Sequence, residues 1–184
     1  DVYKRQTEEV GIDFRHFTGA FGKRYMPETL GSGCAFLDFD NDGNLDILLV
    51  NGKSWKRGES SPTSKLYRNL GNGKFADVTH AAKLDVPMYG MGVAVADYDN
   101  DGDADIYFAN LENNRLFRNN GDRTFTDVTE ISKVGDRRWS TSAAFFDYDR
   151  DGWLDLYLAK GHEPSRDEGK PGKARNRLYL NHAA

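Results

Sequence analysis

The stretch "DYDNDGDADIYFAN", from Asp97 to Asn110, decides the fold because its first half collects acidic residues and its second half alternates like a strand. The aspartates Asp97, Asp99, Asp101 and Asp105 lie within nine residues of this stretch. At ~4 Å and an effective dielectric constant near 20, each pair of carboxylates repels by on the order of 4 kcal/mol. Such a cluster needs compensation, and a bound cation would supply it.

The same pattern occurs three times along the chain. "DFDNDGNLD" begins at Asp38 and "DYDRDGWLD" begins at Asp147, which gives three copies of D-x-D-x-D-G-x-x-D. The following segments also repeat, because "KLYRNLGNGKFADVT" at Lys65 matches "RLFRNNGDRTFTDVT" at Arg115, and "RLYLN" at Arg177 begins a third copy. The copies are about 50 to 60 residues apart, a period typical of propeller blades. One copy could be a solvated acidic turn, but three equivalent copies favour a common role.

Each repeat predicts four antiparallel strands. In the second repeat, residues 92–97 and 105–110 alternate as strands do, with the aspartate loop between them. Residues 115–119 and 124–129 are typical of a hairpin. Radial stacking covers both faces of such sheets, so we predict an all-β chain of about three four-stranded blades, a fragment of a β-propeller. Since closure requires roughly four to eight blades, we expect an arc rather than a ring.

The repeats also predict the boundaries of the blades. The stretch "TEEVGI" at Thr7 resembles "THAAKL" and "TEISKV", which indicates the end of an earlier blade. The predicted units are residues 1–12 as the last strand of a preceding blade, 13–31 as an inserted loop, 32–79 as blade 1, 80–129 as blade 2 and 130–184 as blade 3, which lacks its fourth strand. Five aromatic residues are expected to pack between blades: Phe39, Tyr98, Tyr148, Phe75 and Phe125.

The aspartate loops are predicted to bind calcium. Calcium prefers six to eight oxygen ligands, and a nine-residue loop with carboxylates at positions 1, 3, 5 and 9 can wrap one ion. Position 7 would add its main-chain carbonyl, because its side chains differ among the copies, whereas glycine at position 6 provides the positive φ of a sharp turn. About three structural Ca²⁺ ions are expected. The predicted ligand residues are Asp38, Asp40, Asp42, Asn44 and Asp46, then Asp97, Asp99, Asp101, Asp103 and Asp105, then Asp147, Asp149, Asp151, Trp153 and Asp155.

Two other kinds of metal site fit the sequence poorly. Zinc and copper would need histidine or cysteine, and the loops contain neither. The EF-hand shares the opening D-x-D-x-D-G but requires a bidentate glutamate at position 12 and flanking helices. Position 12 here is Leu49, Phe108 or Leu158, and the flanking residues alternate like strands. The sequence therefore excludes an EF-hand.

Three stretches resemble a known family. "GSGCAFLDFDNDGNLDILLVNG", "GMGVAVADYDNDGDADIYFAN" and "LYRNLGNGKFADVT" resemble FG-GAP repeats, also called VCBS repeats, of the integrin alpha-chain propeller type. "HFTGAFGKRYMPETLGSG" resembles the cartilage acidic protein group, in which such repeats precede an ASPIC/UnbV domain. The resemblance implies a calcium-binding propeller, seven-bladed when complete, in an extracellular, periplasmic or cell-surface protein of adhesion or recognition. The Phe-Gly and Gly-Ala-Pro signatures are not in place at each blade, and nothing attributed to the ASPIC/UnbV domain is carried over.

The insertions between strands predict where a partner binds. They cover residues 13–31, 51–64 and 161–176, all expected on the rim opposite the aspartate loops, and they are rich in lysine, arginine and aromatic residues. A protein or glycan ligand is expected there, because loops on a rigid scaffold often carry recognition, although tolerated surface excursions are the alternative. The net charge of -4 argues against a nucleic-acid partner. No apolar run approaches the length of a membrane span.

No pattern of catalytic residues is visible. The four histidines form no H-E-x-x-H sequence, and the residues around Ser32 do not match a nucleophile elbow. We therefore predict a calcium-stabilised recognition or scaffold module of an exported protein rather than an enzyme. The alternative is the propeller part of an exported hydrolase or lyase whose catalytic residues lie elsewhere.

Overall fold

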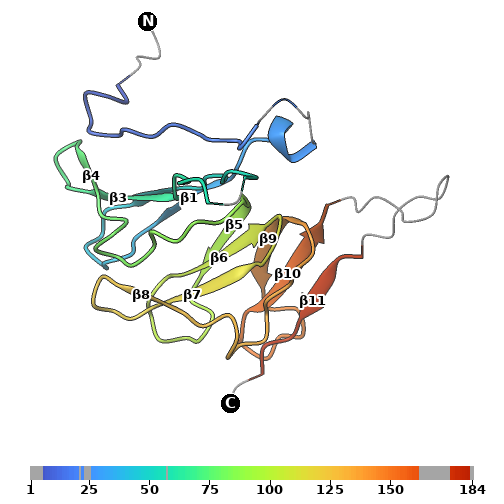
Figure 1. Ribbon diagram of the computed structural model, residues 1–184. Coiled ribbons are helices and arrows are strands. Elements are labelled where there is room, and N and C mark those ends of the chain that lie inside the picture. Colours follow the sequence, from blue (N-terminus) through green and yellow to red (C-terminus); the bar gives the residue numbers. More distant parts are fainter. Residues whose placement is uncertain (1–5, 21, 23–25, 57, 162–174, 183–184) are drawn as a thin grey trace, which may run out of the picture.

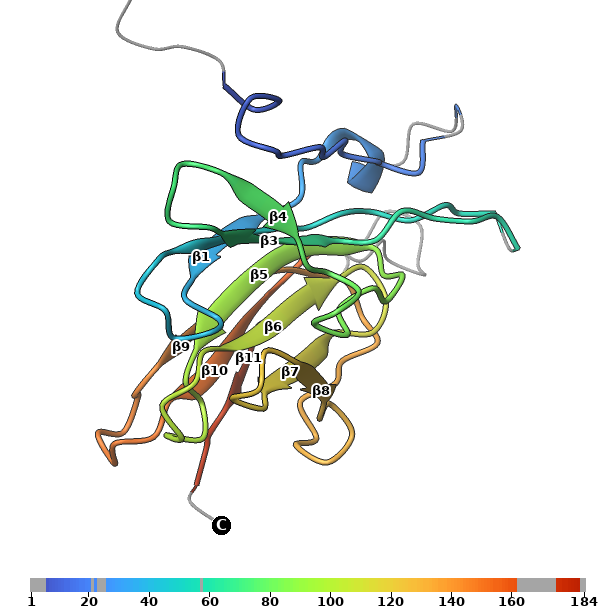
Figure 2. The same ribbon diagram turned by 90° about the vertical axis from the view of Figure 1, so that its left-hand side faces the viewer.

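The computed structural model describes residues 6–20, 22, 26–56, 58–161 and 175–182. Three antiparallel sheets lie next to one another, as Figures 1 and 2 show from two sides. Among the described residues, the only helical element is a short 3-10 helix, η1 (Met26–Thr29), in the inserted loop before the first sheet. The predicted all-β architecture is confirmed.

Each sheet is a meander of neighbouring strands. The first contains β1 (Cys34–Leu37), β2 (Asp46–Leu49), β3 (Lys65–Asn69) and β4 (Phe75–Asp77). The second contains β5 (Gly90–Ala96), β6 (Asp105–Asn110), β7 (Arg115–Asn119) and β8 (Phe125–Asp127). The third contains β9 (Ser140–Phe146), β10 (Asp155–Lys160) and β11 (Arg177–Tyr179), with no fourth strand among the described residues.

Equivalent strands pair in the same register. Ile47 of β2 faces Tyr67 of β3, and Ile106 of β6 faces Phe117 of β7. The third sheet repeats this pair with Leu156 opposite Tyr179. A shift of one residue would move every buried side chain to the other face of its sheet, so the repeated apolar pattern fixes the register.

The hydrophobic core lies between neighbouring sheets. Phe39 and Phe125 are each 2% exposed, and their rings stack with centroids 6.3 Å apart, which joins the first sheet to the second. A separate cluster joins the second sheet to the third and contains Tyr107, Leu116, Val128, Leu156 and Leu158. Burial of apolar surface stabilises by about 25 cal/mol per Å², so sheet-on-sheet packing is the main force that orders the arc.

The first strands of the sheets, β1, β5 and β9, lie close together on the inner side of the arc (Figure 2). A glycine makes the approach of β5 to β9 possible. A Cβ atom on Gly92 would lie 2.6 Å from the carbonyl oxygen of Thr141, closer than any side chain tolerates. Glycine is therefore required at this position for packing rather than for a turn.

Two sequence-based predictions need correction. Of the strand predicted in residues 1–12, residues 1–5 lie outside the described residues and residues 7–11 form a turn. Equivalent turns follow β4 and β8 at residues 79–83 and 129–133. The three turns end on Gly11, Lys83 and Lys133 with φ of 88°, 60° and 55°, a conformation that no strand adopts. Tyr148, predicted to pack between blades, is 61% exposed, because no described sheet follows the third one.

Candidate metal-binding loops

Three loops join the first and second strands of the sheets and lie on one side of the molecule, at the left in Figure 2. We name them loop 1 (residues 38–46), loop 2 (residues 97–105) and loop 3 (residues 147–155). Their first aspartate shapes the turn, because its carboxylate accepts hydrogen bonds from the backbone N–H groups of positions 5 and 6. In loop 2, Asp97 accepts these bonds from Asp101 at 3.1 Å and Gly102 at 2.9 Å. The position 6 glycines have φ of 83°, 92° and 90°, as predicted.

The ninth residue of each loop is an aspartate with no exposed surface: Asp46, Asp105 and Asp155. One Oδ of Asp105 accepts the N–H of Tyr98 at 3.0 Å, and the other accepts the N–H of Asn119 at 2.8 Å. Loops 1 and 3 repeat both bonds. Burial raises the pKa of Asp105 to about 7, with further increases from the charges of Asp99 and Asp101, although the two backbone bonds lower it. Through its two backbone hydrogen bonds, this aspartate holds the loop against the third strand of its own sheet.

The carboxylates at positions 1, 3 and 5 converge in the first two loops. Asp38, Asp40 and Asp42 offer oxygen atoms within 4.8 Å of one another, and so do Asp97, Asp99 and Asp101. Two overlapping groups meet this distance around loop 3, namely Asp147 with Asp149 and Asp155, and Asp149 with Asp151 and His182. The buried Asp46 and Asp105 do not join the groups of their loops.

His182 was not among the predicted ligands. It lies directly after the segment "RLYLN", and no such histidine follows the two equivalent segments. Because only the third repeat carries it, the comparison of repeats gave no signal for it.

The residues at position 7 all donate their backbone N–H to the aspartate at position 5, but their side-chain contacts differ. Asn44 donates its side-chain N–H to Asp42 at 2.9 Å, whereas Asp103 accepts a hydrogen bond from Asn41 of loop 1 at 2.6 Å. Trp153 uses only its backbone N–H, which donates to Asp151 at 2.9 Å. The use of position 7 main-chain carbonyls as ligands stays a prediction.

Buried carboxylate oxygen atoms at position 3 lack hydrogen-bond donors. Oδ1 of Asp99 is buried without a partner, and so is Oδ1 of Asp40, whose Oδ2 lies 2.6 Å from Nε of Arg68. Burial raises the pKa of Asp99, and the neighbouring charges of Asp101 and Asp97 raise it further. A buried acceptor without a donor costs about 1–3 kcal/mol, more when it is charged. A set of carboxylate oxygens without nitrogen or sulfur, as in loops 1 and 2, suits a hard cation such as Ca²⁺, so these residues fit the predicted ion.

Adjacent loops are also linked to one another across the sheets. Asn119, at the end of β7, donates to the carbonyl of Phe39 in loop 1 at 2.9 Å, and Asn181 donates to the carbonyl of Tyr98 in loop 2 at 2.7 Å. Asn100 of loop 2 donates to the carbonyl of Gly152 in loop 3 at 3.2 Å. Ordering of one loop is therefore expected to help order the next.

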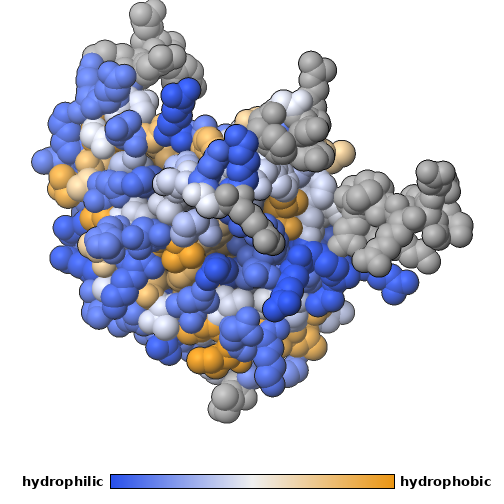
Figure 3. All heavy atoms as spheres, viewed as in Figure 1, coloured by the Kyte–Doolittle hydropathy of each residue, from blue (hydrophilic) through white to orange (hydrophobic). Residues whose placement is uncertain are grey.

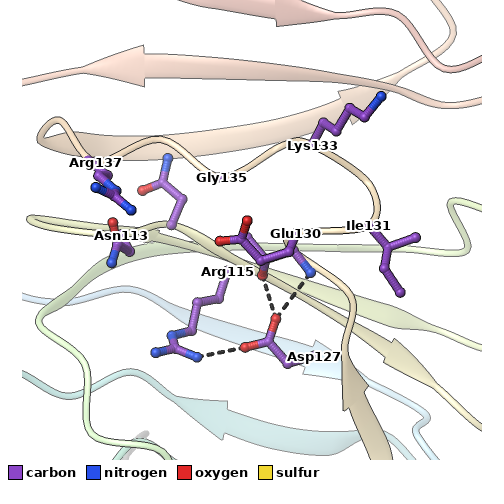
Figure 4. Close-up of a pocket in the computed structure, with 10 residues that line it drawn as sticks. Asn113, Arg115, Asp127, Glu130, Ile131, Lys133, Gly135 and Arg137 are labelled. Atoms are coloured by element: carbon purple, nitrogen blue, oxygen red, sulfur yellow. Dashed lines mark hydrogen bonds and ion pairs between the residues drawn. The ribbon is translucent and has the colours of Figure 1, made fainter.

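A polar cavity of about 480 Å³ lies away from these loops, beside β7 and the turn after β8 (Figure 4). Two of its charges are used inside the fold, because Arg115 pairs with Asp127 at 2.6 Å and Asp127 also accepts bonds from Thr129. The equivalent pair in the first sheet joins Lys65 to Asp77 at 2.7 Å. The Arg115–Asp127 pair in this cavity is therefore a structural feature that the sheets repeat.

The predicted partner rim is described only in part. Within residues 51–64, the ring of Trp55 lies 4.9 Å from that of Tyr89, centroid to centroid. Residues 162–174 of the third insertion fall outside the described residues.

Over the described part of the chain, no helix has the length and apolar character needed to cross a membrane.

Comparison with known families bears directly on the three loops. A family model described as an FG-GAP-like repeat matches residues 38–108 and 97–158. The two overlapping matches cover more than half of the chain and include all three loops. No curated protein sequence matched the chain.

Proposed function

Because the chain belongs to the FG-GAP-like repeat family, we propose that it is a β-propeller module stabilised by calcium at its aspartate loops. The observation that carries this proposal is the buried Oδ1 of Asp99, which has no donor and lies in a group with Asp97 and Asp101. A divalent ion would supply the positive charge that these carboxylates lack. Asp97, Asp99 and Asp101 would hold it, with the carbonyl of Asp103 as a further ligand.

The role proposed for each ion is structural. About three ions would be bound, with the loose dissociation constants of about 10⁻⁴ to 10⁻³ M that are typical of extracellular modules. Because the bound loops belong to the folded state, calcium binding and folding would be coupled.

The proposal also covers the location of the protein, the number of blades in the complete propeller and the surface that binds a partner. FG-GAP repeats typically occur in extracellular proteins, which supports an exported protein of recognition, adhesion or scaffolding. The complete ring would have seven blades, as in the integrin-type propellers and the cartilage acidic protein group with its ASPIC/UnbV domain. A protein or glycan ligand would contact the rim that carries residues 13–31, 51–64 and 161–176. Packing of Trp55 against the buried Tyr89 would hold this rim in place.

A thermal melt with and without calcium tests the proposal. At a free concentration 100 times the dissociation constant, each ion stabilises the fold by about 2.7 kcal/mol, which for a chain of this size raises the Tm by about 5–10 °C. We expect this increase in calcium relative to EDTA, and a smaller one in magnesium. Equal melting temperatures in calcium and EDTA would contradict the proposal.

A pair of variants tests whether one of the calcium ions binds at loop 2. Asp99→Asn should remove one ion from the stoichiometry measured by isothermal titration calorimetry. Glu130→Gln, an exposed change outside the loops, should leave the stoichiometry unchanged. If both variants bind as many ions as the unaltered chain, loop 2 is not a calcium site.

A further inference from the structure

Two links between neighbouring sheets start alike but differ in their charged residues. We name residues 79–89 the first link, which joins β4 to β5, and residues 129–139 the second link, which joins β8 to β9. Each link starts with a threonine whose hydroxyl donates to an aspartate of the preceding strand. Thr79 donates to Asp77 at 2.5 Å, and Thr129 donates to Asp127 at 2.6 Å. Because the two links have the same length, their residues can be compared one by one.

In the first link, an aspartate of the chain lies near the basic residue that begins β3. Oδ2 of Asp85 lies 2.7 Å from Nδ1 of His80. The pKa of Asp85 is lowered, first by this hydrogen bond, and the charge of Lys65 contributes to the decrease. The first link therefore supplies its own carboxylate to this place.

In the second link, this carboxylate is missing and a cavity is present. Gly135 stands at the place of Asp85, and Glu130 stands at the place of His80. The polar cavity of about 480 Å³ lies beside Gly135, and Arg115, the equivalent of Lys65, lines it (Figure 4). Pockets that bind small molecules typically have volumes of about 300–1,000 Å³, so the space is large enough for a small ligand.

Three side chains that line the cavity have no partner in the described part of the chain. Asn113, Glu130 and Arg137 make no hydrogen bond or ion pair there through their side chains. All three residues are exposed, so a ligand can reach them. Figure 4 shows them on the same side of the cavity as Arg115, whereas Lys133 points away from this group.

These side chains offer different kinds of hydrogen bond. Arg115 uses Nη1 for Asp127 at 2.6 Å and has further N–H donors, and Arg137 adds a second guanidinium. Guanidinium groups bind carboxylates through parallel, charge-assisted hydrogen bonds. The carboxylate of Glu130 accepts hydrogen bonds, and the amide of Asn113 both donates and accepts, which suits hydroxyl groups.

The lining favours a sugar over a peptide. Among the described lining residues, Ile131 is the one large apolar side chain, and it is 84% exposed. The end of a peptide would need an apolar pocket for its side chain, whereas a sugar presents hydroxyl groups in several directions. Figure 3 shows mainly hydrophilic residues on this side of the molecule, which is opposite the aspartate loops.

We propose that this cavity binds an acidic sugar, for which a hexuronate is the simplest example. The sugar carboxylate takes the place that Asp85 holds in the first link, and it pairs with Arg137 and Arg115. Glu130 accepts hydrogen bonds from sugar hydroxyl groups, and the amide of Asn113 bonds to another hydroxyl. The site lies outside the three insertions and needs no calcium ion, so it goes beyond the proposed function.

An NMR titration of the isotope-labelled 184-residue chain with methyl β-D-glucuronide, in calcium, tests the proposal. We expect saturable shifts of the backbone amide signals of Gly135 and Arg137, with a dissociation constant of about 1 mM. Methyl β-D-glucoside, which has a hydroxymethyl group instead of the carboxylate, should bind at least about tenfold more weakly. The proposal would be overturned by the absence of saturable shifts up to about 20 mM, or by equal affinity for the two sugars.

Gly135→Asp gives the second link the carboxylate of the first. It should weaken glucuronide binding at least about tenfold, because the new side chain occupies the site and repels the sugar carboxylate. A Cβ atom at this position would lie 3.1 Å from Cγ2 of Thr129, and the first link already holds an aspartate and a threonine at these places. The Tm should therefore stay close to that of the unaltered chain. Undiminished binding by this variant would contradict the assigned site.

A second pair of variants separates a specific contact from general positive charge. Arg137→Gln should weaken glucuronide binding about tenfold and leave glucoside binding unchanged. Lys133→Gln is the matched control, because it removes the same charge from a side chain that points away from the group, and it should leave both affinities unchanged. Equal losses in the two variants would show that binding follows net charge, which would overturn the proposal.

A peptide carboxylate and a simple anion are the competing ligands. N-acetylalanine, which imitates the end of a peptide, and acetate serve as probes in the same titration. Both should bind more weakly than the glucuronide, because neither has hydroxyl groups for Glu130 and Asn113. Tighter binding of N-acetylalanine would overturn the proposal in favour of a peptide end, and equal binding of acetate would reduce the cavity to an anion site.

Discussion

Loops 1 and 3 share one sequence pattern, but their negative charge is compensated differently. In loop 1 the side chain of Asp40 has no exposed surface, and it pairs with Arg68 at 2.6 Å and Arg123 at 3.2 Å. In loop 3 the equivalent of Asp40 is the exposed Asp149, and Leu180 stands at the place of Arg68. The same aspartates can thus be neutralised by the chain's own cations or left for an external one.

The difference comes from the neighbours of each loop. Arg123 reaches loop 1 from the hairpin of the second sheet, and the described chain has no sheet beyond the third that could supply such a residue to loop 3. Loop 2 is intermediate, because Arg118 stands at the place of Arg68 and its charge partly offsets the raised pKa of Asp99, although no ion pair joins Arg118 to the described residues of loop 2. A calcium ion at loop 1 must therefore displace or accommodate an arginine, which loop 3 does not require.

The largest predicted effect concerns the buried aspartate that loops 1 and 3 share at their ninth position. Asp46→Ala and Asp155→Ala should each destabilise the fold by about 4 kcal/mol, because each leaves two backbone N–H groups buried without an acceptor. Chemical denaturation in EDTA measures this cost without any contribution from bound ions.

Asp149→Ala is the control for this first prediction, because Asp149 is an exposed aspartate of the same loop. It should cost under about 1 kcal/mol in EDTA. Equal losses at Asp149 and Asp155 would show that the ninth residue has no special structural role.

Asp136 extends the comparison to another acid that the chain itself neutralises. It is 5% exposed and lies 2.8 Å from Lys160, 3.0 Å from Arg177 and 3.3 Å from Arg138. Asp136→Asn should cost about 3 kcal/mol, because it leaves Lys160 as a buried charge without its partner. Urea denaturation at neutral pH measures the loss.

The pH dependence provides a second test of Asp136. Burial alone would raise its pKa, but hydrogen bonds from Arg138 and Lys160 outweigh burial and lower the pKa to about 2. The carboxylate therefore contributes stability above its unfolded pKa of 3.8, and this contribution is lost as the pH falls from about 4 to about 2. The free energy of unfolding of Asp136→Asn should fall less over this range than that of the unaltered chain; parallel curves would contradict the assignment.

The smallest predicted effect comes from giving loop 1 the residue of loop 3. Arg68→Leu removes the guanidinium that competes for Asp40 and Asp42, so calcium affinity at loop 1 should rise about tenfold, which corresponds to about 1.4 kcal/mol. Terbium luminescence or calorimetry can resolve the change. The reciprocal Leu180→Arg should lower calcium affinity at loop 3. Unchanged affinities in both variants would mean that the arginine does not compete with the ion.

Much of the fold was predictable because the repeats are local patterns. Alternation of side chains predicted β5 and β6, and the repeated glycine predicted the positive φ of Gly102. The convergence of Asp97, Asp99 and Asp101 followed from their spacing around one turn. The turn at residues 7–11 was missed because likeness to "THAAKL" and "TEISKV" shows equivalence, and equivalence alone does not give the conformation.

Other features depend on which sheet lies beside which. The pairing of Arg123 with Asp40 joins residues that are far apart in the chain, and only the packing of the second sheet against the first brings them together. The same holds for Asn41 and Asp103, and for His182 beside loop 3. Such contacts between repeats produce no periodic pattern in the sequence, so sequence analysis does not predict them.

The sequence by itself determined the strand order, the turn geometry and the grouping of the aspartates, because each of these depends on residues within one repeat. Only the tertiary structure decided how the charge of each acidic loop is compensated and which loops bond to one another. Those properties depend on the neighbouring sheet, whose position is set by nonlocal packing of apolar faces rather than by the spacing of residues along the chain.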